Sequence, residues 1–209
     1  PAYEAKPARK IKGNTWYNNG QHSINAVTDG TAKTHESMIR RDIMPGIGIM
    51  TDSNCGIMPS EETSYGIHVL PMPVIIDGRA YGEGVDITPD DFYRKQTSGA
   101  AITTSQPSPG DVTAMWDRLL ASYDEIVFIP MSSGLSNTCQ TALILAEDEP
   151  YRGKVHVVDN HRISVTQAVS VLDAKILADE GRSGAEIKAI LEQESLDATI
   201  YIAVDTLEY

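Results

Sequence analysis

The chain has 209 residues, 41% of them hydrophobic, which is enough to bury the core of one large domain or of one and a half. Its formal net charge of −12 argues against nucleic acid, because proteins bind phosphate backbones with lysine and arginine. No uninterrupted apolar run approaches the roughly 20 residues that a membrane helix needs, so we expect no membrane span.

The first 45 residues differ in composition from the rest. Residues 1–41 hold seven lysines and arginines against three acidic residues, a net charge of +4 that leaves −16 for residues 42–209. Residues 1–45 show no sustained helix or strand period, and the chain starts without a methionine. We expect this segment to be an N-terminal extension or the tail of a preceding domain, and an arm that binds the acidic body or a partner is one possible role.

The cysteines and histidines predict neither a disulfide framework nor a metal site. Cys55 and Cys139 are too few and too far apart for either, and the five histidines lack the spacing of metal ligands. Nothing resembles the apolar core of a secretion signal. We therefore expect a cytoplasmic protein that uses neither a metal nor a cofactor.

Apolar runs and turn signals predict the first elements after residue 45. Residues 46–50 predict a strand, followed by a turn at 51–56, and residues 58–65 predict a short helix with acidic residues in its first turn. The run at 67–76 contains two prolines, which confine it to a sheet edge or divide it into two pieces. The Asp77-Gly78 pair that follows predicts a hairpin.

Helices with clear start signals come next. Thr88 and Pro89 begin one that ends before Ser98, and Ser108 caps another in which Trp116 belongs to the apolar stripe and is expected in the core. After a strand at 126–129, a helix is expected with Ser136 as its N-cap, ending near residue 147. Its apolar stripe contains Ala142, Leu145 and Ala146.

The last third continues the alternation. We expect a strand at 154–159 in which His156 is a structural residue, a helix at 164–180, a helix capped by Ser183 that ends near 194, and a strand at 199–204. The buried face of the 164–180 helix is expected to hold Val165, Val169, Leu172, Ile176 and Leu177. Strands that alternate with helices in this way indicate an α/β fold with a mainly parallel sheet and flanking helices.

Two hydroxyl-rich segments, 103–110 and 132–138, suggest an anion site. The second lies between a strand and a helix start, where free backbone N–H groups and the helix dipole favour a phosphate or a carboxylate. Asp52 and Ser53 are further candidates, because loops after parallel strands bind ligands in open sheets. The alternative is that all these residues only form turns and caps, with Asp52 or Ser53 in an Asx-type turn.

Several motifs in register carry a family resemblance. Over residues 46–209 the chain resembles the DegV family of bacterial fatty-acid-binding proteins. The motifs are T-D-S from Thr51, D-G-x-x-Y at 77–81 followed by G-V-D-I-T, T-S-Q-P-S at 104–108, S-S-x-L-S-x-T at 132–138, V-V-D at 157–159 and D-T-L-E-Y at 205–209.

The resemblance implies a two-domain α/β protein, with a first domain at 46–195 and the start of a truncated second domain at 196–209. It implies one long-chain fatty acid in an apolar tunnel, its carboxylate held by Thr104 and Ser136. Ser132, Ser133 and Ser105 lie near these two in the sequence, and Asp52 and Ser53 are expected in a neighbouring loop. A carrier of this kind is not an enzyme. It presents the acid to an ATP-dependent fatty acid kinase that forms an acyl-phosphate, a step that belongs to phospholipid metabolism.

Two positions depart from the family pattern. Asn137 stands where glycine is usual, and we expect the turn to survive because asparagine tolerates left-handed backbone. Asn160 stands where serine is usual, so no role is assigned to it.

Two enzymatic alternatives remain open. One is a serine-dependent acyl hydrolase or transferase that uses Ser132, Ser133 or Ser136, for which His156 or His161 would be the base. The chain lacks the G-x-S-x-G nucleophile motif that many such enzymes have. The other is a phosphate-binding enzyme, and the chain has neither a P-loop nor a G-x-G-x-x-G motif.

Overall fold

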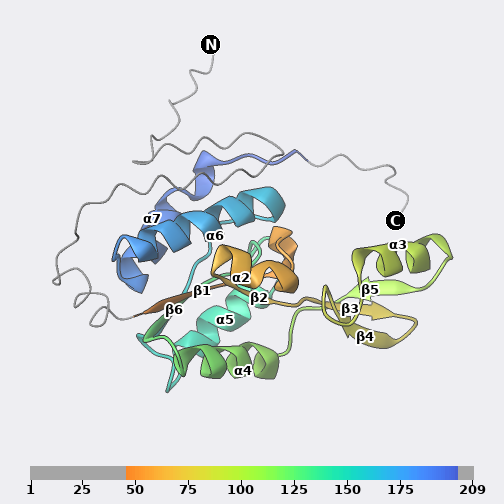
Figure 1. Ribbon diagram of the computed structural model, residues 1–209, viewed down its shortest axis with the longest axis horizontal. Helices are drawn as coiled ribbons and strands as arrows, with labels where there is room; N and C mark the ends of the chain where they lie inside the picture. Colours follow the sequence, from red (N-terminus) through yellow and green to blue (C-terminus); the bar gives the residue numbers. More distant parts are fainter. Residues whose placement is uncertain (1–45, 202–209) are drawn as a thin grey trace, which may run out of the picture. The chain divides into compact units, whose positions relative to one another are not determined.

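A four-stranded parallel sheet forms the centre of residues 46–201, the part of the chain that the computed structural model describes (Figure 1). All of these residues belong to one unit that spans Asp42–Tyr209. The strand order is β2-β1-β6-β7, and every neighbouring pair is parallel. The predicted α/β fold with a parallel sheet is therefore confirmed. Its strands are β1 (Ile47–Asp52), β2 (His68–Leu70), β6 (Glu125–Ile129) and β7 (Val155–Val157).

Helices cover both faces of this sheet (Figure 1). Successive side chains of a strand point to opposite faces, so Ile126 and Phe128 of β6 join one core cluster while Val127 and Ile129 join the other. Burial on both faces explains why these strands read as continuous apolar runs. The first cluster packs under α4 (Pro109–Leu120) and α5 (Thr138–Ala146), and the second under α6 (Ser164–Asp179) and α7 (Gly184–Gln193).

A separate three-stranded antiparallel sheet has the order β4-β3-β5. Its strands are β3 (Pro73–Ile76), β4 (Arg79–Gly82) and β5 (Ile102–Thr104), and α3 (Pro89–Thr97) lies between β4 and β5 in the chain. The hairpin predicted at Asp77-Gly78 joins β3 to β4. The run at 67–76 is indeed divided in two, and its pieces lie in different sheets. Strand β5 was not predicted, because its threonines belong to a segment interpreted only as a hydroxyl-rich loop.

Short helical turns fill the connections. They are η1 (Ser53–Cys55), η2 (Pro59–Glu61), α2 (Glu62–Tyr65) and η3 (Ser195–Asp197), so the short helix predicted at 58–65 is a 3-10 turn followed by one α-helical turn. The three predicted caps are confirmed. The hydroxyls of Thr88, Ser108 and Ser183 each accept the N–H of the residue three positions on, at 3.2, 3.1 and 3.3 Å.

The prediction that Ser136 is the N-cap of α5 is wrong by one residue. The helix begins at Thr138, and Asn137 occupies the cap position with no side-chain hydrogen bond. Asn137 has a φ of −75°, so the left-handed conformation expected there is not adopted. The Ser136 hydroxyl still accepts the N–H of Thr138 at 3.2 Å. Its side chain therefore stays at the start of the helix.

The prediction for the buried face of α6 is wrong for three of its five residues, whereas Leu172 and Leu177 are half-buried and Leu177 packs against the second core cluster. Val165, Val169 and Ile176 are 66%, 53% and 40% exposed. The side chains that the helix buries are mostly small or polar, namely Gln167, Ser170, Val171 and Ala174. The Gln167 amide nitrogen donates to Thr51, Asp52 and Ile129 of neighbouring elements, and the small Ser170 and Ala174 let the helix lie close to the sheet. Apolar periodicity alone cannot detect such a face.

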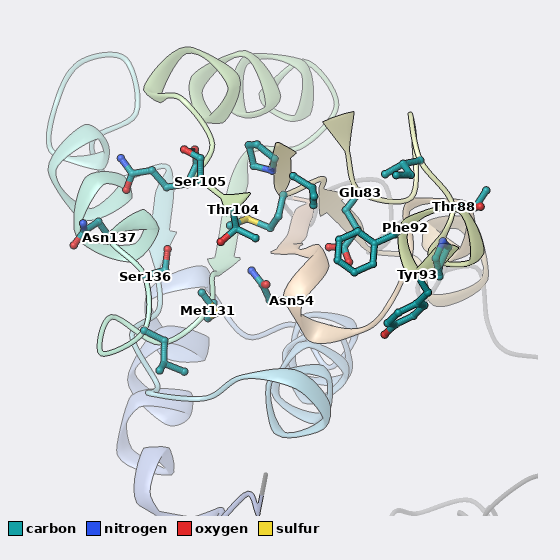
Figure 2. A pocket seen from close by; sticks show the side chains of 17 residues that line it. Asn54, Glu83, Thr88, Phe92, Tyr93, Thr104, Ser105, Met131, Ser136 and Asn137 are labelled. Carbon is teal, nitrogen blue, oxygen red and sulfur yellow. Dashed lines mark hydrogen bonds between the residues drawn. The ribbon is translucent and has the colours of Figure 1, made fainter. Parts of the chain in front are cut away.

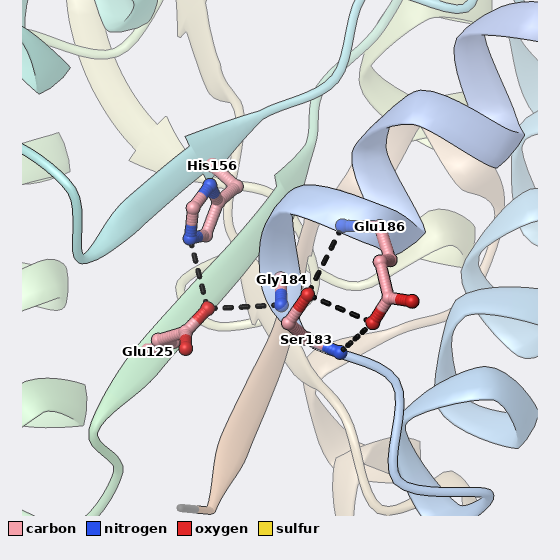
Figure 3. A network of polar contacts seen from close by, with 5 residues as sticks. All are labelled: Glu125, His156, Ser183, Gly184 and Glu186. Carbon is pink, nitrogen blue, oxygen red and sulfur yellow. Dashed lines mark hydrogen bonds and ion pairs between the residues drawn. The ribbon is translucent and has the colours of Figure 1, made fainter.

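One polar contact attaches the start of α7 to the sheet (Figure 3). The Glu125 carboxylate of β6 lies 2.9 Å from His156 Nε2 of β7 and accepts the N–H of Gly184 at 2.9 Å. A Cβ at Gly184 would lie only 2.2 Å from His156 Cδ2, so glycine permits this close approach. The contact with Glu125 agrees with the structural role expected of His156.

The remaining expectations concern the two ends of the chain. Residues 1–45 lie outside the described residues, as do residues 202–204 of the predicted last strand. The described part of that strand, residues 199–201, forms no strand. Within residues 46–201, no helix has both the length and the apolar character needed to cross a membrane.

Candidate ligand-binding site

A pocket of about 420 Å³ lies between the antiparallel sheet and the loops at the carboxyl ends of β1 and β6 (Figure 2). Its volume falls within the range of about 300–1,000 Å³ that is usual for small-molecule sites. Hydroxyl and amide side chains line one side, and apolar and aromatic side chains line much of the remainder. The lining residues are Asn54, Met72, Pro73, Val74, Glu83, Ile87, Thr88, Pro89, Phe92, Tyr93, Thr104, Ser105, Gln106, Met131, Leu135, Ser136 and Asn137.

Thr104 is the last residue of β5 and lines the pocket. The pairing of β5 with β3 sets Thr104 opposite Val74, so the antiparallel ladder fixes its position. Its hydroxyl forms no hydrogen bond with any residue in the described part of the chain. It is therefore available to a ligand, and Ser105 lines the pocket beside it.

Ser136 lines the pocket from the loop between β6 and α5. Its hydroxyl lies 2.9 Å from Thr138 Oγ1 and accepts the N–H of Thr138. Ser136 N–H donates to the carbonyl of Ser132 at 3.1 Å, which closes the loop into a turn. The start of α5 thus holds the hydroxyl at the pocket wall.

Gln106 is a lining residue that the sequence analysis did not single out, although it lies inside the T-S-Q-P-S motif. Its Oε1 is buried and has no partner among the residues described. A buried polar atom without a partner is uncommon, but this oxygen is an acceptor and would not bind a carboxylate. Asn160 also has both side-chain polar atoms buried without a partner, but it does not line the pocket.

Ser132 and Ser133 do not line the pocket. Ser132 is buried, and its hydroxyl accepts the N–H of Gly134 at 3.2 Å. Ser133 donates its backbone N–H to Asp159 Oδ1 at 3.4 Å. Both residues shape the loop that carries Ser136.

Asp52 and Ser53 lie behind the pocket wall and do not line it. Asp52 Oδ2 accepts the N–H of Met131 at 2.7 Å, and Asp52 Oδ1 accepts the N–H of Asn54 at 3.1 Å, as in an Asx-type turn. The Gln167 amide donates to Asp52 Oδ1 at 3.1 Å. Both Asn54 and Met131 line the pocket, so the buried Asp52 holds two parts of its wall together.

Burial raises the pKa of the Asp52 and Cys139 side chains. Loss of solvent raises the pKa of Asp52 above its ordinary value, and the hydrogen bonds from Met131, Gln167 and Asn54 only partly oppose this effect. Burial likewise raises the pKa of the Cys139 thiol to about 12. Cys139 therefore stays a neutral thiol at neutral pH, and neither cysteine forms a disulfide.

The hydrolase alternative has one supporting contact. His161 Nδ1 lies 3.3 Å from Asp159 Oδ1, which is how a carboxylate orients a catalytic histidine. However, no serine hydroxyl hydrogen-bonds to a histidine anywhere in residues 46–201, so the described part of the chain presents no activated serine.

Residues 46–201 contain no group of three or more potential metal ligands arranged around a common point.

Comparison with known proteins shows the family. The model described as "Uncharacterised protein, DegV family" matches residues 46–209. A DegV domain-containing protein of Caldanaerobacter subterraneus is 33% identical over 166 residues, which cover 79% of this chain and 59% of the relative. The chain therefore belongs to the DegV family, as its motifs predicted.

Solved structures agree with this assignment. One similar structure is described as showing fatty acid binding of a DegV family protein from Thermus thermophilus, with 35% identity and a TM-score of 0.63. Another is DegV, a fatty acid binding protein from Bacillus subtilis, with 27% identity and a TM-score of 0.64. The match covers 71% and 72% of this chain but only 53% and 54% of those proteins. The chain thus spans about half the length of the proteins it resembles.

Proposed function

We propose that the chain binds one long-chain fatty acid in the pocket, with its carboxylate held by the hydroxyls of Thr104 and Ser136. The observation that carries the proposal is the unpartnered hydroxyl of Thr104 in a pocket that Ser136 lines as well. Two solved relatives described as fatty-acid-binding proteins support it.

Transfer energies favour an acyl chain as the ligand. Each CH₂ group that leaves water contributes roughly 0.8 kcal/mol, so a long chain needs few polar contacts at its head. Val74, Ile87 and Phe92 provide apolar surface for the first part of that chain. The remaining tunnel wall belongs, on this proposal, to the second α/β domain that the family resemblance implies.

Neutral donors suit a carboxylate that must react later. An arginine would bind the carboxylate through two charge-assisted hydrogen bonds and reduce its nucleophilicity. No lysine, arginine or histidine is among the pocket-lining residues. We therefore propose a carrier that has no catalytic group of its own and presents the acid to a separate ATP-dependent fatty acid kinase.

Mass spectrometry of an organic extract tests the binding. The purified full chain should yield a long-chain fatty acid in about equimolar amount, and the Thr104→Val, Ser136→Ala double variant should yield much less, because both carboxylate donors are lost. Absence of lipid from the wild-type extract, together with ester cleavage that one serine substitution abolishes, would favour the hydrolase.

A matched double variant controls for loss of hydroxyls in general. Thr103 is exposed on the same strand as Thr104 but does not line the pocket, and Ser122 is exposed in the turn before β6. The Thr103→Val, Ser122→Ala variant should keep the lipid. The kinase step is tested separately, by adding a bacterial fatty acid kinase and ATP and trapping the acyl-phosphate with hydroxylamine.

A further inference from the structure

Glu83 is the single charged side chain among the 17 residues that line the pocket. It follows β4, lies beside the apolar part of the wall, and is half-buried. A carboxylate is an unexpected group in a pocket proposed for another carboxylate. Its position therefore requires an explanation beyond the binding of the head group.

Hydrogen bonds fix Glu83 in place. Ser53 Oγ lies 2.5 Å from Glu83 Oε2 and accepts the N–H of Met72 at 3.0 Å, so the hydroxyl proton of Ser53 points to the carboxylate. The backbone N–H of Glu83 donates to the carbonyl of Met72 at 3.0 Å. Ser53 is only 2% exposed, so this support is internal. The hydrogen bond therefore holds the carboxylate in one position at the pocket wall.

No positive charge compensates Glu83. Within the described range, no lysine, arginine or histidine forms an ion pair with it, and no cation lines the pocket. Ser53 is a neutral donor and leaves the net charge in place. Glu83 therefore carries the only formal charge among the residues that line the pocket.

The charge lies away from the proposed head-group site. Thr104 is on β5 and Glu83 follows β4, and these strands flank β3 on opposite sides. Neighbouring strands lie roughly 4.8 Å apart, which separates the two backbones by about 10 Å. Figure 2 shows Glu83 near Phe92 and Tyr93, whereas Ser105, Ser136 and Asn137 gather on the other side.

We propose that Glu83 is a specificity-determining residue that fixes the direction of the bound acid and excludes acids with a second carboxylate. This inference rests on the proposed function, because it concerns the same pocket. A carboxylate at the Thr104 side meets only neutral donors, while one at the Glu83 side meets a fixed negative charge. The pocket then accepts a monocarboxylic acid in one orientation and disfavours a dicarboxylic acid of the same length.

Binding of acids that differ only at the far end tests this inference. Decanoic, decanedioic and 10-aminodecanoic acid are titrated against a fluorescent fatty acid bound to the full chain, with hexadecanoic acid as the reference ligand. An extended chain of ten carbons sets the ω group about 10 Å from the carboxylate. Both ω-substituted acids carry a charge that must leave water, so their ratio isolates the sign of that charge. We expect the diacid to bind at least about tenfold more weakly than the ω-amino acid. Glu83→Gln should lower this ratio about tenfold, and Glu83→Asp, which keeps the charge, should preserve most of it.

A series of chain lengths provides a second measurement on the wild-type chain, in case Glu83→Gln does not fold. The preference for the ω-amino acid should peak at the length that brings the ω group beside Glu83. An equal preference at every length, or a ratio that Glu83→Gln leaves unchanged while hexadecanoic acid binds, overturns the role of Glu83 alone. Failure of hexadecanoic acid to bind overturns the proposed function as well.

Discussion

The two sheets of this protein differ in the number of buried hydrophobic residues that pack against them. The parallel sheet lies between clusters of 14 and 12 buried hydrophobic residues, whereas the antiparallel sheet has a cluster of three. Apolar burial is the main favourable term in folding, so most of the stability belongs to the parallel sheet. The antiparallel sheet contributes Thr104 and much of the apolar wall to the pocket. Stability and ligand contact are thus largely divided between the two sheets.

Shortening a buried side chain should give the largest difference in lost stability between the two sheets. Phe128 is fully buried beside Trp116, with ring centroids 6.3 Å apart, and Phe128→Ala should cost about 3–5 kcal/mol of unfolding free energy. Ile76→Ala in the antiparallel sheet should cost about 2 kcal/mol, since fewer buried neighbours surround it. Urea denaturation measures both. Equal costs would mean that the small sheet is as strongly built as the large one.

The contact between α7 and the parallel sheet should be the next most sensitive. A methyl group at Gly184 would meet His156 Cδ2 at 2.2 Å and Glu125 Oε2 at 2.5 Å, so Gly184→Ala should cost about 1–3 kcal/mol. Gly110 occupies the first turn of α4, where a Cβ would meet nothing closer than 3.7 Å. Thermal melts measure both variants, and Gly110→Ala should be neutral or slightly stabilising. A similar loss in both variants would contradict the steric argument.

The buried Asp52 should make the unfolding free energy of the chain depend on pH. Its raised pKa means that the folded chain binds a proton at a higher pH than the unfolded chain does. Its contribution to stability is therefore full at pH values below the ordinary aspartate pKa and decreases as pH rises through the folded pKa. The difference in unfolding free energy between wild type and Asp52→Asn should follow this decline. A difference that grows with pH would reverse the sign of the pKa shift.

The smallest effect is expected from chemical labelling of the two cysteines. Each cysteine lies in the core on a different face of the parallel sheet. Cys139 belongs to the cluster under α4 and α5, and Cys55 to the cluster under α6 and α7. Burial raises the pKa of both thiols, to about 12 for Cys139. Iodoacetamide should modify neither at neutral pH until urea unfolds the chain, as mass spectrometry can measure. Rapid labelling of only one would show that its face opens locally.

The parallel sheet was predictable because its signals are local. Buried strands read as apolar runs, and Ser108 and Ser183 mark the starts of α4 and α7 with their own side chains. The face of α6 was not predictable, since Gln167 is buried only because Thr51, Asp52 and Ile129 of other elements accept its hydrogen bonds. That information is tertiary and leaves no period in the sequence.

The pocket was predictable only in part. The resemblance led to Thr104, Ser105 and Ser136, all of which line it, while Asp52 and Ser53 lie one layer behind. Nothing in the sequence signalled Glu83, because its place in the wall depends on the pairing of β4 with β3 and on a hydrogen bond from Ser53, 30 positions away. The G-V-D-I-T motif directly follows Glu83, but it contributed only to the family resemblance and did not identify Glu83.

The antiparallel sheet is an excursion of the chain between β2 and α4. Residues 73–104 depart from the parallel sheet after Leu70 and return at α4, so only two short connections join them to it. Insertions, deletions and substitutions within that excursion need not disturb the pairing of β2, β1, β6 and β7. Selection can therefore reshape much of the pocket wall while the folding scaffold stays the same, which gives a single architecture room to diversify.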